Sequence, residues 1–223
     1  MRGLRIGLVV FDCDGVLVDS EVIACRVEAE VLTAIGFPHS FEDVRRDYVG
    51  LGAASVRRLI EERFGRALPE DFRARSLAAA LAAFERELKP IPGIVDAIAR
   101  LDGPRCVASS SDPARIRRSL ELTGLLDAFD PHLFSATMVE HGKPAPDLFL
   151  HAAQSMGFPP SRCVVIEDSV PGVQAARAAG MTVLGFHGGS HCAPDHPAKL
   201  ENAGAHLLFA DMHDLPTLLT RLE

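Results

Sequence analysis

Short apolar runs, each ended by polar residues or glycine, recur along the chain. The four runs are Leu8–Phe11, Arg105–Ala108, Cys163–Ile166 and Met181–Phe186. Brief runs rich in β-branched residues predict strands buried on both faces of a sheet. Apolar residues at helical spacing occupy the intervening segments 113–123, 147–156 and 169–179, each followed by a glycine. This alternation predicts an α/β fold, a parallel sheet with helices on both faces.

The segment between the first and second predicted strands has a different pattern. It holds four helical stretches, at residues 21–35, 41–48, 53–64 and 72–88. About seventy residues are too many for a simple crossover between parallel strands. We therefore expect residues 18–88 to form an inserted helical cap domain, and residues 1–17 and 89–223 to form a Rossmann-like α/β core. The linkers would lie near residues 18–20 and 89–93.

Composition and charge exclude several classes of protein. The chain has 223 residues, 48% of them hydrophobic and 24% charged, which is ordinary globular composition. A net charge of −7 without a basic stripe argues against a nucleic-acid partner. Five cysteines without CxxC spacing favour reduced thiols, and no apolar run approaches the roughly 18 residues of a membrane span. We expect a cytoplasmic protein with no cleavable leader and no membrane partner; the sequence leaves the oligomeric state open.

Two aspartates follow the first predicted strand. Asp12 and Asp14 are two residues apart, with Gly15 directly behind them. Such residues point to the same side of a strand, and the carboxyl end of a strand is where open α/β sheets bind ligands. Two carboxylates in one crevice repel each other unless a cation lies between them. Mg²⁺ beside a substrate phosphate satisfies this arrangement.

The other predicted strand ends carry complementary groups. Ser109 and the backbone amides of Ser110 and Ser111 follow the second strand, and Glu167 and Asp168 follow the third. Lys143, one of only three lysines in the chain, lies just ahead of a helix. A hydroxyl, an ammonium and several carboxylates at successive strand ends predict a site that holds an anion and a cation together.

These groups suffice for phosphoryl transfer, which needs positioning and charge neutralisation above all. Asp12 would attack phosphorus as the nucleophile. Asp14 would protonate the leaving alkoxide and then deprotonate the hydrolytic water. Mg²⁺ would be held by Asp12, the Asp14 carbonyl and Asp168, while Lys143 and Ser109 would bind the transferring oxygens.

Four motifs in order carry a resemblance to a known family. They are Asp12-x-Asp14-Gly15, Ser109, Lys143-Pro144-x-Pro146-Asp147 and Glu167-Asp168-Ser169-x-x-Gly172. Together they resemble the haloacid dehalogenase superfamily, in its Mg²⁺-dependent phosphatase and phosphomutase branch with a helical cap. The resemblance implies the same roles as the residue chemistry, and places Glu167 at the metal as well, often through water.

Several activities of this superfamily compete with hydrolysis. The dehalogenases themselves lack the second aspartate, which Asp14 supplies here, and phosphonatases use a cap lysine, of which residues 20–88 have none. A β-phosphoglucomutase is the main alternative. Its cap histidine would fall at Ala24, and the loop 48–54 lacks an arginine at the matching place. A catalytically idle binding protein is a further alternative, although the nucleophile and metal ligands are all present.

The substrate class follows from the start of the cap. Residues 11–23 resemble bacterial 6-phosphogluconate and related sugar-phosphate phosphatases, so we expect a small phosphorylated metabolite, a sugar phosphate or a phospho-sugar acid. Cap arginines are candidates for binding a second anionic group. They are Arg26, Arg45, Arg46, Arg57, Arg58, Arg63, Arg66, Arg73 and Arg75. Glu21 and Arg26 are expected to line the entrance.

A histidine-rich segment follows the last predicted strand. His187, His191, Cys192 and His196 fit no tetrahedral metal pattern by their spacing. We interpret the segment as a loop near the strand ends, and His141 as a turn residue.

Overall fold

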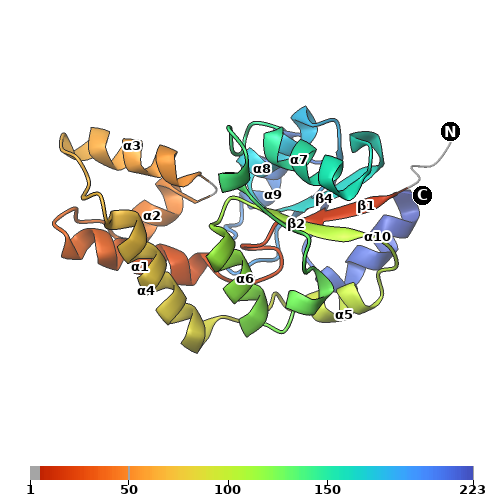
Figure 1. Cartoon of the computed structure of the whole chain (residues 1–223), viewed down its shortest axis with the longest axis horizontal. Helices are drawn as coiled ribbons and strands as arrows, with labels where there is room; N and C mark the ends of the chain where they lie inside the picture. Colours follow the sequence, from red (N-terminus) through yellow and green to blue (C-terminus); the bar gives the residue numbers. More distant parts are fainter. Residues whose placement is uncertain (1–5, 50, 223) are drawn as a thin grey trace.

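A six-stranded parallel sheet forms the centre of the protein (Figure 1). The computed structural model describes residues 6–49 and 51–222; residues 1–5 of the expected core segment and Gly50 of the cap loop lie outside it. The strands are β1 Leu8–Phe11, β2 Arg105–Ser109, β3 Leu133–Ser135, β4 Cys163–Glu167, β5 Thr182–Phe186 and β6 Leu207–Phe209. Their order is β3-β2-β1-β4-β5-β6, which confirms the predicted α/β class.

The register of the sheet brings the functional strand ends together. Val10 of β1 pairs with Cys106 of β2 on one side and with Val165 of β4 on the other. All three strands run in the same direction, so their carboxyl ends lie at the same side of the sheet. The residues after β1, β2 and β4 are thereby neighbours in space.

Helices cover both faces of the sheet. Alternate residues of β1 point to opposite faces: Val9 and Phe11 belong to one buried cluster, and Leu8 and Val10 to the other. The first cluster is covered by α5 Ile94–Ala99, α6 Pro113–Leu122 and α10 Leu215–Leu222; the second is covered by α7 Asp147–Met156, α8 Val170–Ala178 and α9 His196–Ala203. Within residues 6–49 and 51–222, no helix combines the length and apolarity needed to cross a membrane.

Four helices between β1 and β2 stand apart from the sheet in Figure 1. They are α1 Glu21–Ala34, α2 Phe41–Asp47, α3 Ala53–Phe64 and α4 Phe72–Glu87. Residues such as Leu32, Phe37 and Ile60 form a hydrophobic cluster of their own. The two connections to the core run side by side, because Val18 bridges Pro90 and the Asp19 N–H donates to the Lys89 carbonyl at 2.9 Å. We propose that residues 18–88 form a cap domain on this double linker.

The hydrophobic cluster of the cap provides a stability prediction. Leu32 is fully buried, so Leu32→Ala should lower the free energy of unfolding by about 2–5 kcal/mol through lost contacts and a cavity. Leu207 is 38% exposed, and Leu207→Ala should have a much smaller effect. Urea denaturation measures both. Equal losses would contradict the proposed packing of the cap.

Candidate active site

Two buried aspartates lie at the carboxyl end of β1. The Asp12 backbone N–H donates to the Ile166 carbonyl at 3.0 Å, which keeps the chain beside β4 for one residue beyond the strand. The chain then turns at Gly15, whose φ of +82° lies in the left-handed region that favours glycine. A Cβ atom there would also overlap Asp168 Oδ2. The turn therefore holds Asp12 and Asp14 at the strand ends, 7% and 9% exposed.

Lys143 connects two strands through a buried ion-pair network. Its Nζ lies 2.6 Å from Asp12 Oδ1 and 2.6 Å from Glu167 Oε1. Burial alone would lower the pKa of the lysine, but the two carboxylates outweigh it and raise the pKa, so the ammonium stays charged. Burial raises the pKa of Asp12; Lys143 opposes this, and Glu167 and Asp168 add to it. The site thus holds more negative charge than its lysine neutralises.

Glu167 is held on both carboxylate oxygens. Oε1 accepts from Lys143 at 2.6 Å, and Oε2 accepts from the Ser169 N–H at 2.7 Å and the Ser169 hydroxyl at 2.9 Å. A Cβ atom at Gly172, in the first turn of α8, would overlap the Glu167 carboxylate. Glycine is therefore needed at this position of the motif for close packing. These contacts make Glu167 the second anchor of the lysine.

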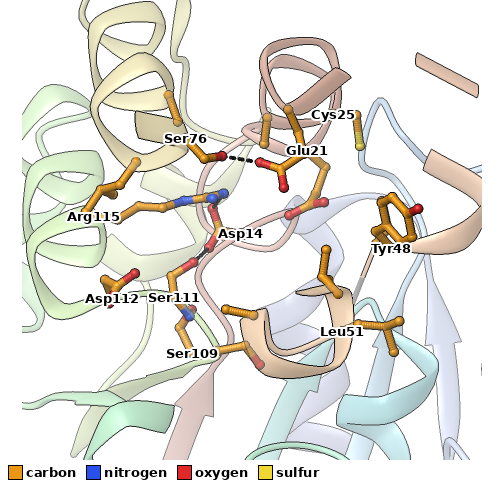
Figure 2. Close-up of a pocket in the computed structure, with 18 of the residues that line it drawn as sticks. Asp14, Glu21, Cys25, Tyr48, Leu51, Ser76, Ser109, Ser111, Asp112 and Arg115 are labelled. Atoms are coloured by element: carbon orange, nitrogen blue, oxygen red, sulfur yellow. Dashed lines mark hydrogen bonds and ion pairs between the residues drawn. The ribbon is translucent and has the colours of Figure 1, made fainter. Parts of the chain in front are cut away.

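Asp14 is surrounded by hydrogen-bond donors (Figure 2). Ser20 Oγ and Arg115 Nη2 donate to Oδ1 at 2.6 Å each, and Ser111 Oγ donates to Oδ2 at 2.5 Å. Burial by itself would raise the pKa of Asp14, but Arg115 and the two hydroxyls outweigh it and hold the pKa below its usual value. The arrangement keeps Asp14 ionised. The only signal for Arg115 in the sequence is its place in the first turn of a helix that follows a strand.

Consecutive serines at the end of β2 face the same site. Ser109 is buried, and its hydroxyl oxygen accepts from the Ser111 N–H at 3.1 Å. Ser109, Ser110 and Ser111 all line the cavity described below. The expected serines therefore lie along the same cavity as Asp14, and Ser111, expected for its backbone amide, also binds Asp14 through its hydroxyl.

Asp168 contacts the histidine-rich segment. His191 Nε2 lies 2.9 Å from Asp168 Oδ2, and His196 Nε2 lies 2.5 Å from the Asp168 backbone oxygen. Burial would lower the pKa of His191, but the Asp168 carboxylate outweighs it, with a contribution from Cys192, and raises the pKa to about 11. The segment is thus more than a connecting loop, because it packs directly against the expected metal ligand. The segment follows β5, which pairs in parallel with β4, so it lies next to Asp168 at the end of β4. The spacing of the residues in the sequence does not reveal this contact.

A cavity of about 450 Å³ lies between the acidic residues and the cap. The core contributes Asp12, Asp14, Ser109, Ser110, Ser111, Asp112, Arg115, Lys143, Asp168 and Ser169 to its lining. The cap contributes Glu21, Glu28, Tyr48 and Ser76, among others, and Figure 2 shows how α1 and α4 place such side chains opposite Asp14. Burial raises the pKa of Glu21 to about 7, with Asp14 adding to it, and burial also raises the pKa of Glu28.

Two of the nine candidate cap arginines line this cavity. They are Arg57 and Arg73, and each already has partners: Arg57 binds Glu61, and Arg73 binds Asp112 at 2.6 Å. Arg26, expected at the entrance with Glu21, instead pairs with Glu87 at 2.7 Å on the exposed surface. The buried guanidinium that faces the cavity belongs to the core residue Arg115. Most cap arginines form ion pairs with aspartates or glutamates of the cap itself. The number of arginines in the cap sequence does not reveal this pairing.

The charges of the site suit a hard divalent cation. Asp12, Asp14, Glu167 and Asp168, here called the acidic cluster, offer oxygen ligands. Lys143 sits among them, and the raised pKa of Asp12 reflects in part the repulsion that an added cation would relieve. Oxygen donors of this kind are the ligands preferred by Mg²⁺ and Ca²⁺ rather than by softer metals.

Comparison with known proteins gives consistent matches. The profile of the haloacid dehalogenase-like hydrolase family matches residues 6–180. The chain is similar to a 6-phosphogluconate phosphatase of Escherichia coli K12, 31% identical over 85% of this chain and 86% of that protein. It is also similar to a fructose-1-phosphate phosphatase of the same organism, 33% identical over 78% and 93%. A haloacid dehalogenase-like protein of unknown function from Agrobacterium tumefaciens has a solved structure with TM-score 0.82, 40% identity, and coverage of 97% and 99%.

Glu21 provides a pH-dependence prediction. Its carboxyl pKa of about 7 in the folded chain exceeds the ordinary value of 4.5, so the folded state binds more protons between these values. The free energy of unfolding should therefore fall as the pH rises through this window. Glu21→Gln removes this term, and the variant should gain stability over the wild type between about pH 5 and about pH 8.

Urea denaturation at a series of pH values measures the difference. The matched control is Glu62→Gln, at an exposed glutamate of the same cap. Parallel stability curves for Glu21→Gln and the wild type would contradict the raised pKa of Glu21.

Proposed function

The chain belongs to the haloacid dehalogenase-like hydrolases and is a phosphatase, and we propose that it hydrolyses a small organic phosphate monoester through an aspartyl-phosphate on Asp12. The observation that carries this proposal is the buried contact between Asp12 and Lys143 at the carboxyl end of the sheet. A carboxylate beside a fixed ammonium is placed to attack a phosphoryl group whose oxygens the same ammonium neutralises.

The proposed reaction has two steps. In the first, an Asp12 oxygen bonds to phosphorus, the bond to the leaving alkoxide breaks, and Asp14 gives the alkoxide its proton. In the second, water attacks the phosphorus of the aspartyl-phosphate, Asp14 takes the proton, and inorganic phosphate leaves with the Asp12 carboxylate restored. Lys143, Ser109 and the Ser110 backbone amide would bind the phosphoryl oxygens, a role supported by their position along the cavity wall.

Phosphatases of this family generally use a divalent metal, and we propose Mg²⁺ for this chain. Asp12, the Asp14 backbone carbonyl and Asp168 would hold it, and Glu167 is a further candidate through water. The oxygen donors and the crowding of carboxylates support this choice. When bound, the ion would neutralise charge between the carboxylates and the phosphate.

Arg115 supports a substrate with a second anionic group. Its guanidinium lies in the cavity next to Asp14, and its Nε is buried without a hydrogen-bond partner among the residues that the structure describes. In this arrangement Arg115 keeps Asp14 ionised, whereas the first step needs Asp14 protonated. A substrate carboxylate that binds Arg115 would draw the guanidinium away and let the pKa of Asp14 rise. We therefore propose a phosphorylated sugar acid, the class to which the substrate named for the 6-phosphogluconate phosphatase relative belongs.

The mutase alternative receives less support. Ala24, on the cavity wall, offers no side chain that binds a sugar or transfers a proton. An idle binding protein would be expected to lose the nucleophile or its lysine partner, and here both are present and in contact.

Asp12→Asn tests the nucleophile. The amide has almost the same shape but is a poor nucleophile, so phosphate release should fall at least about a thousandfold, with circular dichroism unchanged. Asp127→Asn, at an exposed aspartate of the core, is the matched control and should keep full activity. Turnover that survives in Asp12→Asn would overturn the assignment.

Arg115→Met tests the second anionic group. The ratio of kcat/KM for 6-phosphogluconate to kcat/KM for p-nitrophenyl phosphate should fall about 10- to 100-fold, since a charge-assisted hydrogen bond contributes about 1.5–3 kcal/mol. The ratio removes any effect on Asp14 that both substrates share. Arg118→Met changes an exposed arginine of the same helix and should leave the ratio unchanged. An unchanged ratio in Arg115→Met would exclude Arg115 as the specificity residue.

A further inference from the structure

Three potential metal ligands gather behind Asp168. Atoms of His191, Cys192 and His196, here called the His–Cys cluster, all lie within 4.8 Å of one another. His191 Nε2 is 3.5 Å from Cys192 Sγ. Zn–N bonds of about 2.0 Å and Zn–S bonds of about 2.3 Å give a nitrogen–sulfur separation of roughly 3.5 Å around a tetrahedral ion. The observed spacing therefore matches one edge of a zinc coordination sphere.

The tautomer of His196 suits metal binding. Its Nε2 lies 2.5 Å from the Asp168 backbone oxygen, and a carbonyl oxygen only accepts hydrogen bonds, so Nε2 carries the proton. This leaves the lone pair of Nδ1 available. Histidine ligands in metal sites usually donate their second N–H in this way, which fixes the ring.

Two glycines pack closely against the His191 ring of the cluster, where any larger residue would collide with it. A Cβ atom at Gly189 would lie 2.8 Å from the His191 ring, and one at Gly15 would lie 2.8 Å from the same ring. His191 is 7% exposed, whereas Cys192 is only half-buried. The ring is therefore fixed between two backbone segments, while the Cys192 thiol is partly exposed to solvent.

We propose that His191, Cys192 and His196 bind a thiophilic divalent metal ion, Zn²⁺. Two imidazole nitrogens and a thiolate are ligands that select zinc over Mg²⁺. Because a ligating imidazole nitrogen must be deprotonated, the ion would displace the proton that His191 Nε2 holds against Asp168. The fourth position would be taken by water or by Asp168 Oδ2, which lies 2.9 Å from His191 Nε2. This site is distinct from the oxygen site of the acidic cluster and shares one wall with it.

Zinc at this site would inhibit the phosphatase, a consequence that rests on the proposed function. Asp168 is the proposed Mg²⁺ ligand, and its carboxylate and backbone oxygens already contact the two histidines of the cluster. A zinc ion held by these histidines would draw the Asp168 carboxylate away from the catalytic cation. Free zinc would then lower activity without competing for the substrate.

Co²⁺, a spectroscopic substitute for Zn²⁺, tests the site directly. The full chain is titrated with Co²⁺ in the presence of excess Mg²⁺. The Mg²⁺ fills the oxygen site of the acidic cluster but has little affinity for thiolate and imidazole, so it does not block the His–Cys cluster. The wild type should develop the thiolate-to-cobalt charge-transfer band at one Co²⁺ per chain, and Zn²⁺ should abolish it. Cys192→Ser should lack the band. His187→Asn, which changes a histidine of the same segment outside the cluster, should keep it.

A second variant keeps the thiol. His196→Asn should weaken Co²⁺ binding at least about 100-fold, because even loss of a partner outside the coordination sphere commonly costs about 10–100-fold. A missing band in the wild type, or a band that persists in Cys192→Ser, would overturn the proposal.

Phosphate release in excess Mg²⁺ tests the consequence. Equimolar Zn²⁺ should inhibit the wild type and His187→Asn, with lower kcat and unchanged KM, and should spare Cys192→Ser. Equal inhibition of Cys192→Ser would overturn the inhibitory role. If no variant releases phosphate from any substrate, the proposed function fails, while the cobalt band still decides the metal site.

Discussion

The buried ammonium of Lys143 is the contact on which the acidic cluster depends. Carboxylates from the ends of β1 and β4 converge where little solvent reaches them, and Lys143 binds one oxygen of Asp12 and one of Glu167 at 2.6 Å. Removing one partner of such a network leaves buried charges uncompensated, which is strongly destabilising. Glu167 is held in turn by Ser169, and Gly172 makes room for it. The lysine thus fixes Asp12, the proposed nucleophile, relative to the sheet.

A second charged pair, formed by Arg115 and Asp14, lies in the cavity between the core and the proposed cap. Arg115 binds Asp14 from the first turn of α6, while α1 and α4 of the cap close the other side of the same cavity. Asp14, the proposed acid/base residue, is therefore coupled to whatever occupies the space between the core and the proposed cap. The guanidinium of Arg115 would then affect both substrate specificity and proton transfer by Asp14. Side chains of the cap, including Glu21, line the rest of the cavity.

The sequence predicted the parts of this protein that local pattern and motif determine. The strands β1, β2, β4 and β5 are buried runs. The predicted site residues lie at or just after the ends of β1, β2 and β4, or ahead of a helix; they are Asp12, Asp14, Ser109, Lys143 and Asp168. The strands β3 and β6 were not predicted, because each has three residues and lies at an edge of the sheet. Arg115 and His191 were missed as site residues, and Ser111 was expected only for its backbone amide, since only the folded chain brings these side chains to Asp14 and Asp168.

Chemical trapping of the intermediate decides whether Asp12 is the nucleophile. Enzyme quenched during turnover is treated with borohydride, which reduces an acyl phosphate to an alcohol and converts a phosphorylated aspartate to homoserine. Peptide mass spectrometry then locates the modified residue. We predict homoserine at position 12, dependent on substrate and absent in Asp12→Asn. Turnover with an unmodified position 12, or with homoserine at another aspartate, would show that the phosphoryl group does not pass through Asp12.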